Sequence, residues 1–250
     1  GASDVVAMGS NDDPKRVWDL WLIQGIGAQN QPPLLLSVDA PPEGVIPFTV
    51  LRDGSVRLSV ASAAADLEGD GFDEALWLMP QGDNACALLR HDIAGGKSEA
   101  LARSQLLFDE PCATPVLSAA DLTGDEQLDL LLLLGNPEVA PRRLQVLWND
   151  GDGGFSRDER SFIGDAEDDV RAFSVFPDSN RRFQRVAFVT SSALHVTSWS
   201  RTGLAFDVVR CFGPVDDARA VSVLDPNTDK NTDLVVADAE GLWLVGAKLR

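Results

Sequence analysis

The 250-residue sequence predicts an all-β fold, and three observations lead to it. Short apolar runs recur along the chain between clusters of Gly, Asn, Asp and Pro, which is typical of strands joined by turns. Four such runs form a unit that recurs along the chain. In three units, an acidic loop separates the first two runs. Because units of this size cannot bury their faces alone, the pattern predicts a β-propeller of about five four-stranded repeats.

The second and third repeats define the unit. The second reads as VRLSVASAAA, EALWLMP, ACALLRHDI and EALARSQLLF, although SEALARSQLLF also suits a helix. The third reads as TPVLSAA, DLLLLLG, RRLQVLWN and FSRDERSF in the same order. The last repeat has room for only three strands, so we expect an incomplete blade. The chain is predicted to form one domain over residues 1–250, with approximate repeats at 4–55, 56–111, 112–168, 169–217 and 218–250.

The acidic loops have the spacing of calcium ligands. Calcium takes six to eight oxygen ligands, and a tight loop supplies them from alternate side chains and a main-chain carbonyl. Counted from the first Asp, oxygen-bearing residues stand at positions one, three, five and nine, with a carbonyl at position seven. The candidates are Asp66, Glu68, Asp70, Phe72, Glu74 and its substitute Asp73; Asp121, Thr123, Asp125, Gln127 and Asp129; and Asp225, Asn227, Asp229, Asn231 and Asp233. We therefore expect about three calcium ions.

Two other kinds of loop have similar residues. Asp, Asn and Gly are also ordinary turn residues, but three copies in one register favour a metal site. An EF-hand needs a Glu at position twelve, where this chain has Trp77, Leu132 and Val236. The equivalent segments of the first and fourth repeats carry poor ligands, so no metal is expected there; they are Ser10, Asp12, Pro14 and Trp18, and Pro177, Ser179, Arg181 and Arg185.

The loops that begin DLEGDG and DLTGD, with VLWNDGDGGF at residues 146–155, resemble the FG-GAP/VCBS repeats of integrin α-subunit propellers and of many bacterial secreted or surface proteins. The resemblance implies that each loop joins the first two strands of a blade and that calcium stiffens this rim. It also implies an extracellular, periplasmic or cell-surface location. Integrin-like propellers usually have seven blades, so five repeats form either a smaller ring or an arc completed by other blades or chains.

The composition argues against nucleic acid and membranes as partners. The net charge of −18 argues against nucleic acid, because that binding depends on Lys and Arg at phosphates. No apolar run reaches 18 residues, so we expect no membrane insertion, and no signal peptide is recognised. The chain has three cysteines, Cys86, Cys112 and Cys211. A disulfide between the first two is one alternative, and packing as small buried hydrophobes is the default expectation.

We expect no enzymatic activity. His91 and His195 lack a nearby nucleophile motif, and the pairs Asp168–Asp169 and Asp216–Asp217 are expected to be solvated turns. The predicted function is a calcium-binding scaffold for protein recognition or adhesion. The alternatives are a lectin-like module that binds a glycan, and a propeller domain accessory to an enzyme. Trp21, Trp77, Trp148 and Trp243 lie in apolar runs and the chain has no Tyr, which favours core packing over sugar stacking.

Overall fold

The structure is a computed structural model of the whole chain. The ranges that it describes are 3–9, 19–26, 34–36, 48–50, 56–58, 60–71, 73–80, 85–91, 103–136, 141–149, 151, 153–155, 161–163, 169–177, 183–199, 206–212, 217–224 and 233–245. Within these ranges the regular structure is entirely β, as the sequence predicts. They contain no helix that is long and apolar enough to cross a membrane.

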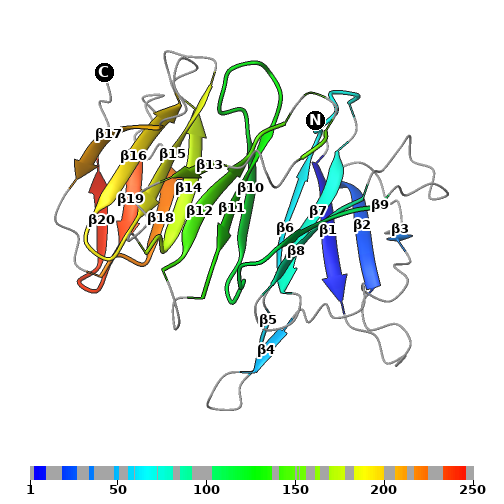
Figure 1. Cartoon of the computed structure of the whole chain (residues 1–250), viewed down its shortest axis with the longest axis horizontal. Helices are drawn as coiled ribbons and strands as arrows, with labels where there is room; N and C mark the ends of the chain where they lie inside the picture. Colours follow the sequence, from blue (N-terminus) through cyan, green and yellow to red (C-terminus); the bar gives the residue numbers. More distant parts are fainter. Residues whose placement is uncertain are drawn as a thin grey trace.

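The described strands form six small antiparallel sheets (Figure 1). The first sheet has three strands, β1 (Ser3–Gly9), β2 (Asp19–Ile26) and β3 (Leu34–Leu36), and a separate hairpin pairs β4 (Phe48–Val50) with β5 (Val56–Leu58). The next sheet contains β6 (Ala61–Ala65), β7 (Glu74–Pro80), β8 (Cys86–His91) and β9 (Arg103–Phe108). It is followed by β10 (Val116–Ala120), β11 (Asp129–Leu134), β12 (Arg143–Leu147) and β13 (Ser161–Ile163).

The last two sheets follow the same plan. One contains β14 (Ala172–Pro177), β15 (Gln184–Val189), β16 (Leu194–Trp199) and β17 (Phe206–Phe212). The other has three described strands, β18 (Ala220–Leu224), β19 (Asp233–Ala237) and β20 (Leu242–Val245). In every sheet the strand order follows the sequence order, so each sheet is an antiparallel meander.

Two local features differ from the sequence prediction. The run at residues 56–65 was expected to be one strand, but β5 pairs with β4, and β6 begins at Ala61 in the next sheet. Residues 103–108, where a helix was an alternative, form β9. This strand pairs with β8 along its whole length and buries Phe108, so cross-strand packing decides the conformation against helix propensity.

Three apolar clusters lie between successive sheets. The first cluster joins β6–β9 to β10–β13, the second joins β10–β13 to β14–β17, and the third joins β14–β17 to β18–β20. The run DLLLLL of β11 shows how the sequence achieves this. Leu130, Leu132 and Leu134 belong to the first cluster, whereas Leu131 and Leu133 belong to the second. A strand with apolar residues at every position is therefore buried on both faces.

Apart from the β4–β5 hairpin, the sheets lie side by side in sequence order, with β1–β3 and β18–β20 at opposite ends of the row (Figure 1). The first strand of each sheet contacts the first strand of the next: β1 contacts β6, β6 contacts β10, β10 contacts β14 and β14 contacts β18. The acidic loops lie between the first and second strands of their sheets. They therefore recur at the same end of successive sheets.

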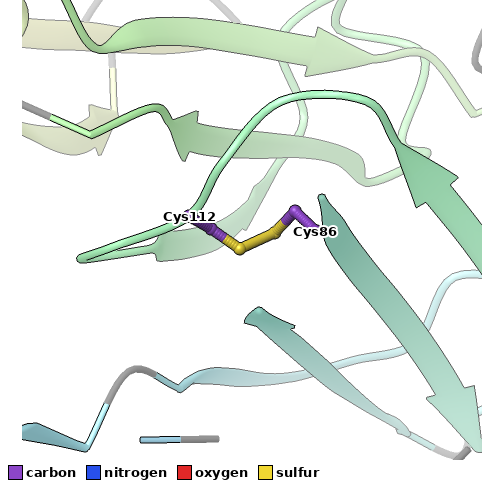
Figure 2. Close-up of a disulfide and its surroundings, with 2 residues drawn as sticks. All are labelled: Cys86 and Cys112. Atoms are coloured by element: carbon purple, nitrogen blue, oxygen red, sulfur yellow. A yellow bond between two sulfur atoms is a disulfide. The ribbon is translucent and has the colours of Figure 1, made fainter. Parts of the chain in front are cut away.

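Cys86 and Cys112 form a disulfide (Figure 2). The expectation that they are separate buried hydrophobes is wrong. Cys86 begins β8, while Cys112 makes an isolated bridge with Gly135 beside the end of β11, and their Cα atoms are 5.5 Å apart. Both residues are buried in the first cluster, so the bond joins two neighbouring sheets. The side chain of Cys211 lies outside the described part of the structure.

Candidate metal-binding rim

The first two acidic loops have the same backbone conformation. In the loop that begins at Asp66, positions four and six are Gly69 and Gly71, with φ of 71° and 89°. In the loop that begins at Asp121, the same positions are Gly124 and Glu126, with φ of 80° and 71°. The same spacing of acids in the two copies thus gives the same loop conformation. The sixth position of the loop has a left-handed backbone and is a glycine in one copy and a glutamate in the other.

The aspartate at position one closes each loop. The Asp66 carboxylate accepts hydrogen bonds from the backbone N–H groups of Asp70 at 3.1 Å and Gly71 at 2.9 Å. The Asp121 carboxylate accepts from Gly124 at 2.6 Å and Glu126 at 3.0 Å. Each carboxylate thus bonds backbone N–H groups three to five residues further along the chain, so it orders the loop even without a cation.

The acid at position nine is buried in both loops and accepts a hydrogen bond from position two. Glu74 accepts from the Leu67 N–H at 2.7 Å, and Asp129 accepts from the Leu122 N–H at 3.3 Å. Burial raises the pKa of Asp129 to about 7, opposed by hydrogen bonds from Asn149 and Leu122, and the nearby Asp125 and Asp121 also raise it. This carboxyl is therefore held close to two other acids in a partly dehydrated site, where a cation would favour its charged form.

Thr123, at position three of the second loop, also fits an oxygen-ligand site. Its hydroxyl oxygen is buried and has no hydrogen-bond partner among the described residues. A buried hydroxyl normally has a partner, because leaving it unsatisfied costs free energy. Threonine hydroxyl, carboxylate and carbonyl oxygens are ligand types suited to a hard cation such as calcium. The donor chemistry of the second loop therefore fits the predicted metal.

The other predicted ligands of the first two loops include one side chain in an ion pair and three that are exposed. Glu68 forms an ion pair with Arg90 of β8. Asp70, Asp73 and Asp125 are exposed. Within the described residues, no group of three or more His, Cys, Asp or Glu side chains converges closely enough to hold a metal ion. The two loops therefore share a backbone conformation, but their described carboxylates are not already gathered around one point.

Most of the third loop lies outside the described residues, as does Phe72 of the first. This applies to Asp225, Asn227, Asp229 and Asn231. Asp233, at position nine, begins β19 and is buried. It thus has the same place at the start of the second strand as Glu74 and Asp129.

A hydrogen-bond network that the sequence analysis did not identify joins the first two loops. The Asn149 side chain donates to the carbonyl oxygens of Leu67 at 2.7 Å and Leu128 at 3.2 Å, while its backbone N–H donates to Asp129 at 3.0 Å. Its side-chain oxygen accepts from Gly151 and Gly153. Asn149 therefore fixes the first loop, the second loop and its own turn together. Asn149 lies within NDGDGG, which the sequence marks as a turn. The sequence did not indicate that its side chain joins two loops.

Two further contacts extend this network. Arg90 of β8 donates to the Gly153 carbonyl oxygen as well as pairing with Glu68. On the other side, Gln184 of β15 holds the backbone of Asp121 at both ends: its N–H donates to the Asp121 carbonyl at 2.7 Å, and its side-chain oxygen accepts from the Asp121 N–H at 2.9 Å. Asn149, Arg90 and Gln184 thus connect the first two loops and the start of β15 into one rim, which we call the loop rim.

Charged residues connect the sheets at a second location. Arg142 donates to the Thr114 hydroxyl and the Arg171 carbonyl, and its backbone N–H donates to Asp169. Arg171 pairs with Asp169 at 3.7 Å and with Asp217. Asp169 and Asp217 lie outside the strands and keep partly exposed side chains, as the sequence predicts, and arginines from neighbouring segments also reach both. Asp168 and Asp216 lie outside the described residues.

Comparisons with known proteins give no family. No protein-family model matches the chain, and no curated protein matches it. Among solved structures it is similar to BBS1N in complex with ARL6DN, soaked with lead, with 14% identity, a TM-score of 0.48, and coverage of 82% of this chain and 56% of that chain. It is also similar to the V. cholerae biofilm matrix protein Bap1, with 16% identity, a TM-score of 0.39, and coverage of 98% of this chain and 39% of that chain. The chain thus spans well under two thirds of either structure, and no conclusion rests on these likenesses.

Proposed function

We propose that this chain is a calcium-stiffened, non-enzymatic β-propeller-type scaffold of the FG-GAP/VCBS kind that binds another protein. The main observation behind the proposal is that the same loop conformation recurs along one rim. Asp66 and Asp121 each accept a hydrogen bond from the backbone N–H of position six, and Glu74 and Asp129 are buried at the same position. A rim of ordered, cross-connected loops is a surface suited to recognition, because binding loops on a rigid scaffold lose little entropy on binding.

The propeller arrangement is supported by how the sheets meet. The first strands of consecutive sheets contact one another, and the apolar clusters fill the spaces between sheet faces. In a propeller, each blade packs face to face on the next, and the innermost strands surround the axis. The blade count of about five that the sequence predicts is also part of this proposal.

Calcium would be held by the oxygens of each acidic loop. In the second loop these are Asp121, Thr123, Asp125, Asp129 and the Gln127 carbonyl. Two features of this loop support a cation there: the buried Thr123 hydroxyl oxygen has no hydrogen-bond partner among the described residues, and burial raises the pKa of Asp129, whose charged form a cation would favour. When bound, calcium would supply charge neutralisation and loop rigidity.

The proposed absence of catalysis is supported by one described histidine. The His195 ring stacks on Phe188 with ring centroids 4.6 Å apart and an interplanar angle of 6°. A stacked ring of this kind is explained by packing. Asp66, Glu74, Asp121 and Asp129 accept hydrogen bonds from backbone N–H groups, and we assign none of the rim acids a role in proton transfer.

The proposed partner is a protein, and the proposed location is extracellular, periplasmic or at a cell surface. The disulfide between Cys86 and Cys112 supports this location, because such bonds persist in oxidising compartments. A glycan is the less favoured ligand. Trp77 is buried and Trp148 packs against the second cluster, which removes two aromatic rings from a sugar-stacking surface.

Capture of a partner from the native source tests the proposal. Immobilised chain in millimolar calcium is expected to retain a protein that elutes with EDTA, since the loops lose their fixed shape before the sheets do. Asp70→Ala is expected to weaken capture, while Glu240→Ala, at the exposed turn between β19 and β20, is the control. Equal retention in calcium and EDTA would contradict a calcium-stiffened binding surface. Glycan-array binding without protein capture would favour the lectin-like alternative.

A further inference from the structure

Strand register places an arginine beside the first acidic loop where the next sheet has a valine. Arg90 of β8 pairs with Leu76 of β7, and Val146 of β12 pairs with Leu131 of β11. Leu76 and Leu131 are each the eleventh residue counted from the first Asp of their loop. Arg90 and Val146 are therefore equivalent. Val146 belongs to the second apolar cluster, whereas Arg90 brings a charged group to the same buried position.

The Arg90 guanidinium is held from two sides. It donates to the Gly153 carbonyl oxygen and forms an ion pair with Glu68, the residue at position three of the first loop. The Arg90 side chain is only 10% exposed, against 40% for Glu68. A Cβ at Gly153 would lie 2.6 Å from Arg90 Nη1 and 2.9 Å from Glu68 Cγ, so these groups pack closely. Asn149 in turn holds the Gly153 N–H. The arginine is therefore a fixed positive charge beside the first loop.

Position three thus differs in kind between the two loops. In the second loop it is Thr123, whose buried hydroxyl oxygen has no hydrogen-bond partner among the described residues. In the first loop it is Glu68, whose charge Arg90 already balances. If Glu68 turned to a metal ion, it would leave a largely buried guanidinium without this carboxylate, and breaking a buried ion pair in that way is costly. Glu68 is therefore better placed to hold Arg90 than to hold calcium.

We propose that Arg90 acts as an internal cation that keeps Glu68 out of the ligand set, so that the first loop binds calcium more weakly than the second. The inference rests on the proposed calcium binding and adds the residue that sets its affinity. Calcium affinity depends on the number of charged ligands, and a fixed positive charge nearby repels a second cation. The second loop then fills before the first as the calcium concentration rises.

Proteins that keep one described loop each test the order of affinities. Asp125→Ala with Asp229→Ala keeps the first loop, and Asp70→Ala with Asp229→Ala keeps the second. Calorimetric titration with calcium is expected to give the first loop a Kd about tenfold higher than that of the second. Equal Kd values, or a tighter first loop, would overturn the proposal. Arg90 is native in both proteins, so this comparison does not depend on how an Arg90 variant folds.

Substitution of Arg90 in the first-loop protein tests its role. Arg90→Gln can still donate to the Gly153 carbonyl but has no charge, so it frees Glu68 and is expected to lower the Kd for calcium about tenfold. Arg90→Lys keeps the charge and is expected to bind as weakly as its parent. A purely structural arginine would not tighten calcium binding when it is removed. An unchanged or higher Kd in a folded Arg90→Gln protein, as judged by thermal melting, would therefore overturn the proposal.

Arg219→Gln in the same protein is the control for net charge. The Arg219 side chain is 67% exposed and pairs with Asp217, next to the end of β18 that lies away from its acidic loop. Its removal changes the net charge equally and is expected to leave the Kd unchanged. Failure of both single-loop proteins to bind calcium would refute the proposed calcium binding and this inference with it. Equal binding by both, with no effect of Arg90→Gln, would refute the role of Arg90 alone.

Discussion

The side-chain amide of Asn149 donates a hydrogen bond of 2.7 Å to the carbonyl oxygen of Leu67, 82 residues earlier in the chain. This contact joins the turn after β12 to the first acidic loop. The same side chain also accepts from Gly151 and Gly153, so a single buried amide organises two loops from neighbouring sheets. The loop rim is therefore one connected structure.

Asn149→Ala is expected to destabilise the protein by about 1–3 kcal/mol, because it leaves the buried Leu67 carbonyl and two glycine N–H groups without this partner. Urea unfolding measures the change. Asn149→Asp is the informative companion, since it retains the acceptor oxygen but loses the donor to Leu67. We expect it to be no more stable than Asn149→Ala, because its charge also lies beside Asp129. An unfolding midpoint equal to that of wild type would show that Asn149 does not hold the rim.

The disulfide is expected to stabilise the fold. Cys86 and Cys112 are separated by 26 residues, and closing a loop of that size contributes about 3 kcal/mol in the chain-entropy model. The double variant Cys86→Ala, Cys112→Ala should lose about this amount, and reductant should weaken wild type but not the variant. Thiol titration of the unfolded, unreduced protein provides the check. One free thiol per chain is expected, and three would contradict the bond.

The sixth loop position gives a paired test of backbone conformation. Glu126 has φ of 71°, a conformation that costs a residue with a Cβ about 1–2 kcal/mol. Glu126→Gly is therefore expected to stabilise the protein by about 1 kcal/mol. Gly71→Ala should destabilise it by a similar amount. A Cβ at Gly71 meets nothing within 4 Å, so that cost arises from φ alone. If both variants changed the thermal midpoint in the same direction, the shared loop conformation would be refuted.

Much of this architecture follows from local sequence and the rest does not. Strands such as β7 and β11 depend on neighbouring residues, so their apolar runs predicted them. The Asn149–Leu67 contact, the Cys86–Cys112 bond and the Arg171–Asp217 pair each join different sheets. Only the stacking of sheets brings these residues together. No single-sequence pattern determines that stacking.

Asp217 provides a pH-dependent test. Hydrogen bonds from Arg219 and Arg171 lower its pKa below the ordinary value of 3.8. A lowered carboxyl pKa contributes stability above about pH 4 and loses it as the pH falls further. Asp217→Asn should therefore destabilise the protein at neutral pH, and the difference from wild type should shrink near about pH 2. Thermal melting at both pH values checks this, with the exposed Glu240→Gln as the control. A difference that is independent of pH would show that the ion pairs do not contribute.

Substitution of single predicted ligands tests each calcium site separately. Asp70→Ala and Asp229→Ala are each expected to remove one calcium ion, because each deletes the central carboxylate of its loop. Arg181→Ala, in the degenerate fourth repeat, is expected to leave the number of bound ions unchanged. Equilibrium dialysis with calcium measures this number. Unchanged stoichiometry in both aspartate variants would show that the ligand assignment is wrong.

Calorimetric titration of the metal-free protein with calcium tests the central claim most directly. The account predicts saturable binding of about three ions. It also predicts a matching rise in stability of about 2.7 kcal/mol at a hundredfold excess over Kd for each site. Absence of binding heat at several temperatures, together with equal melting temperatures in millimolar calcium and in EDTA, would contradict it.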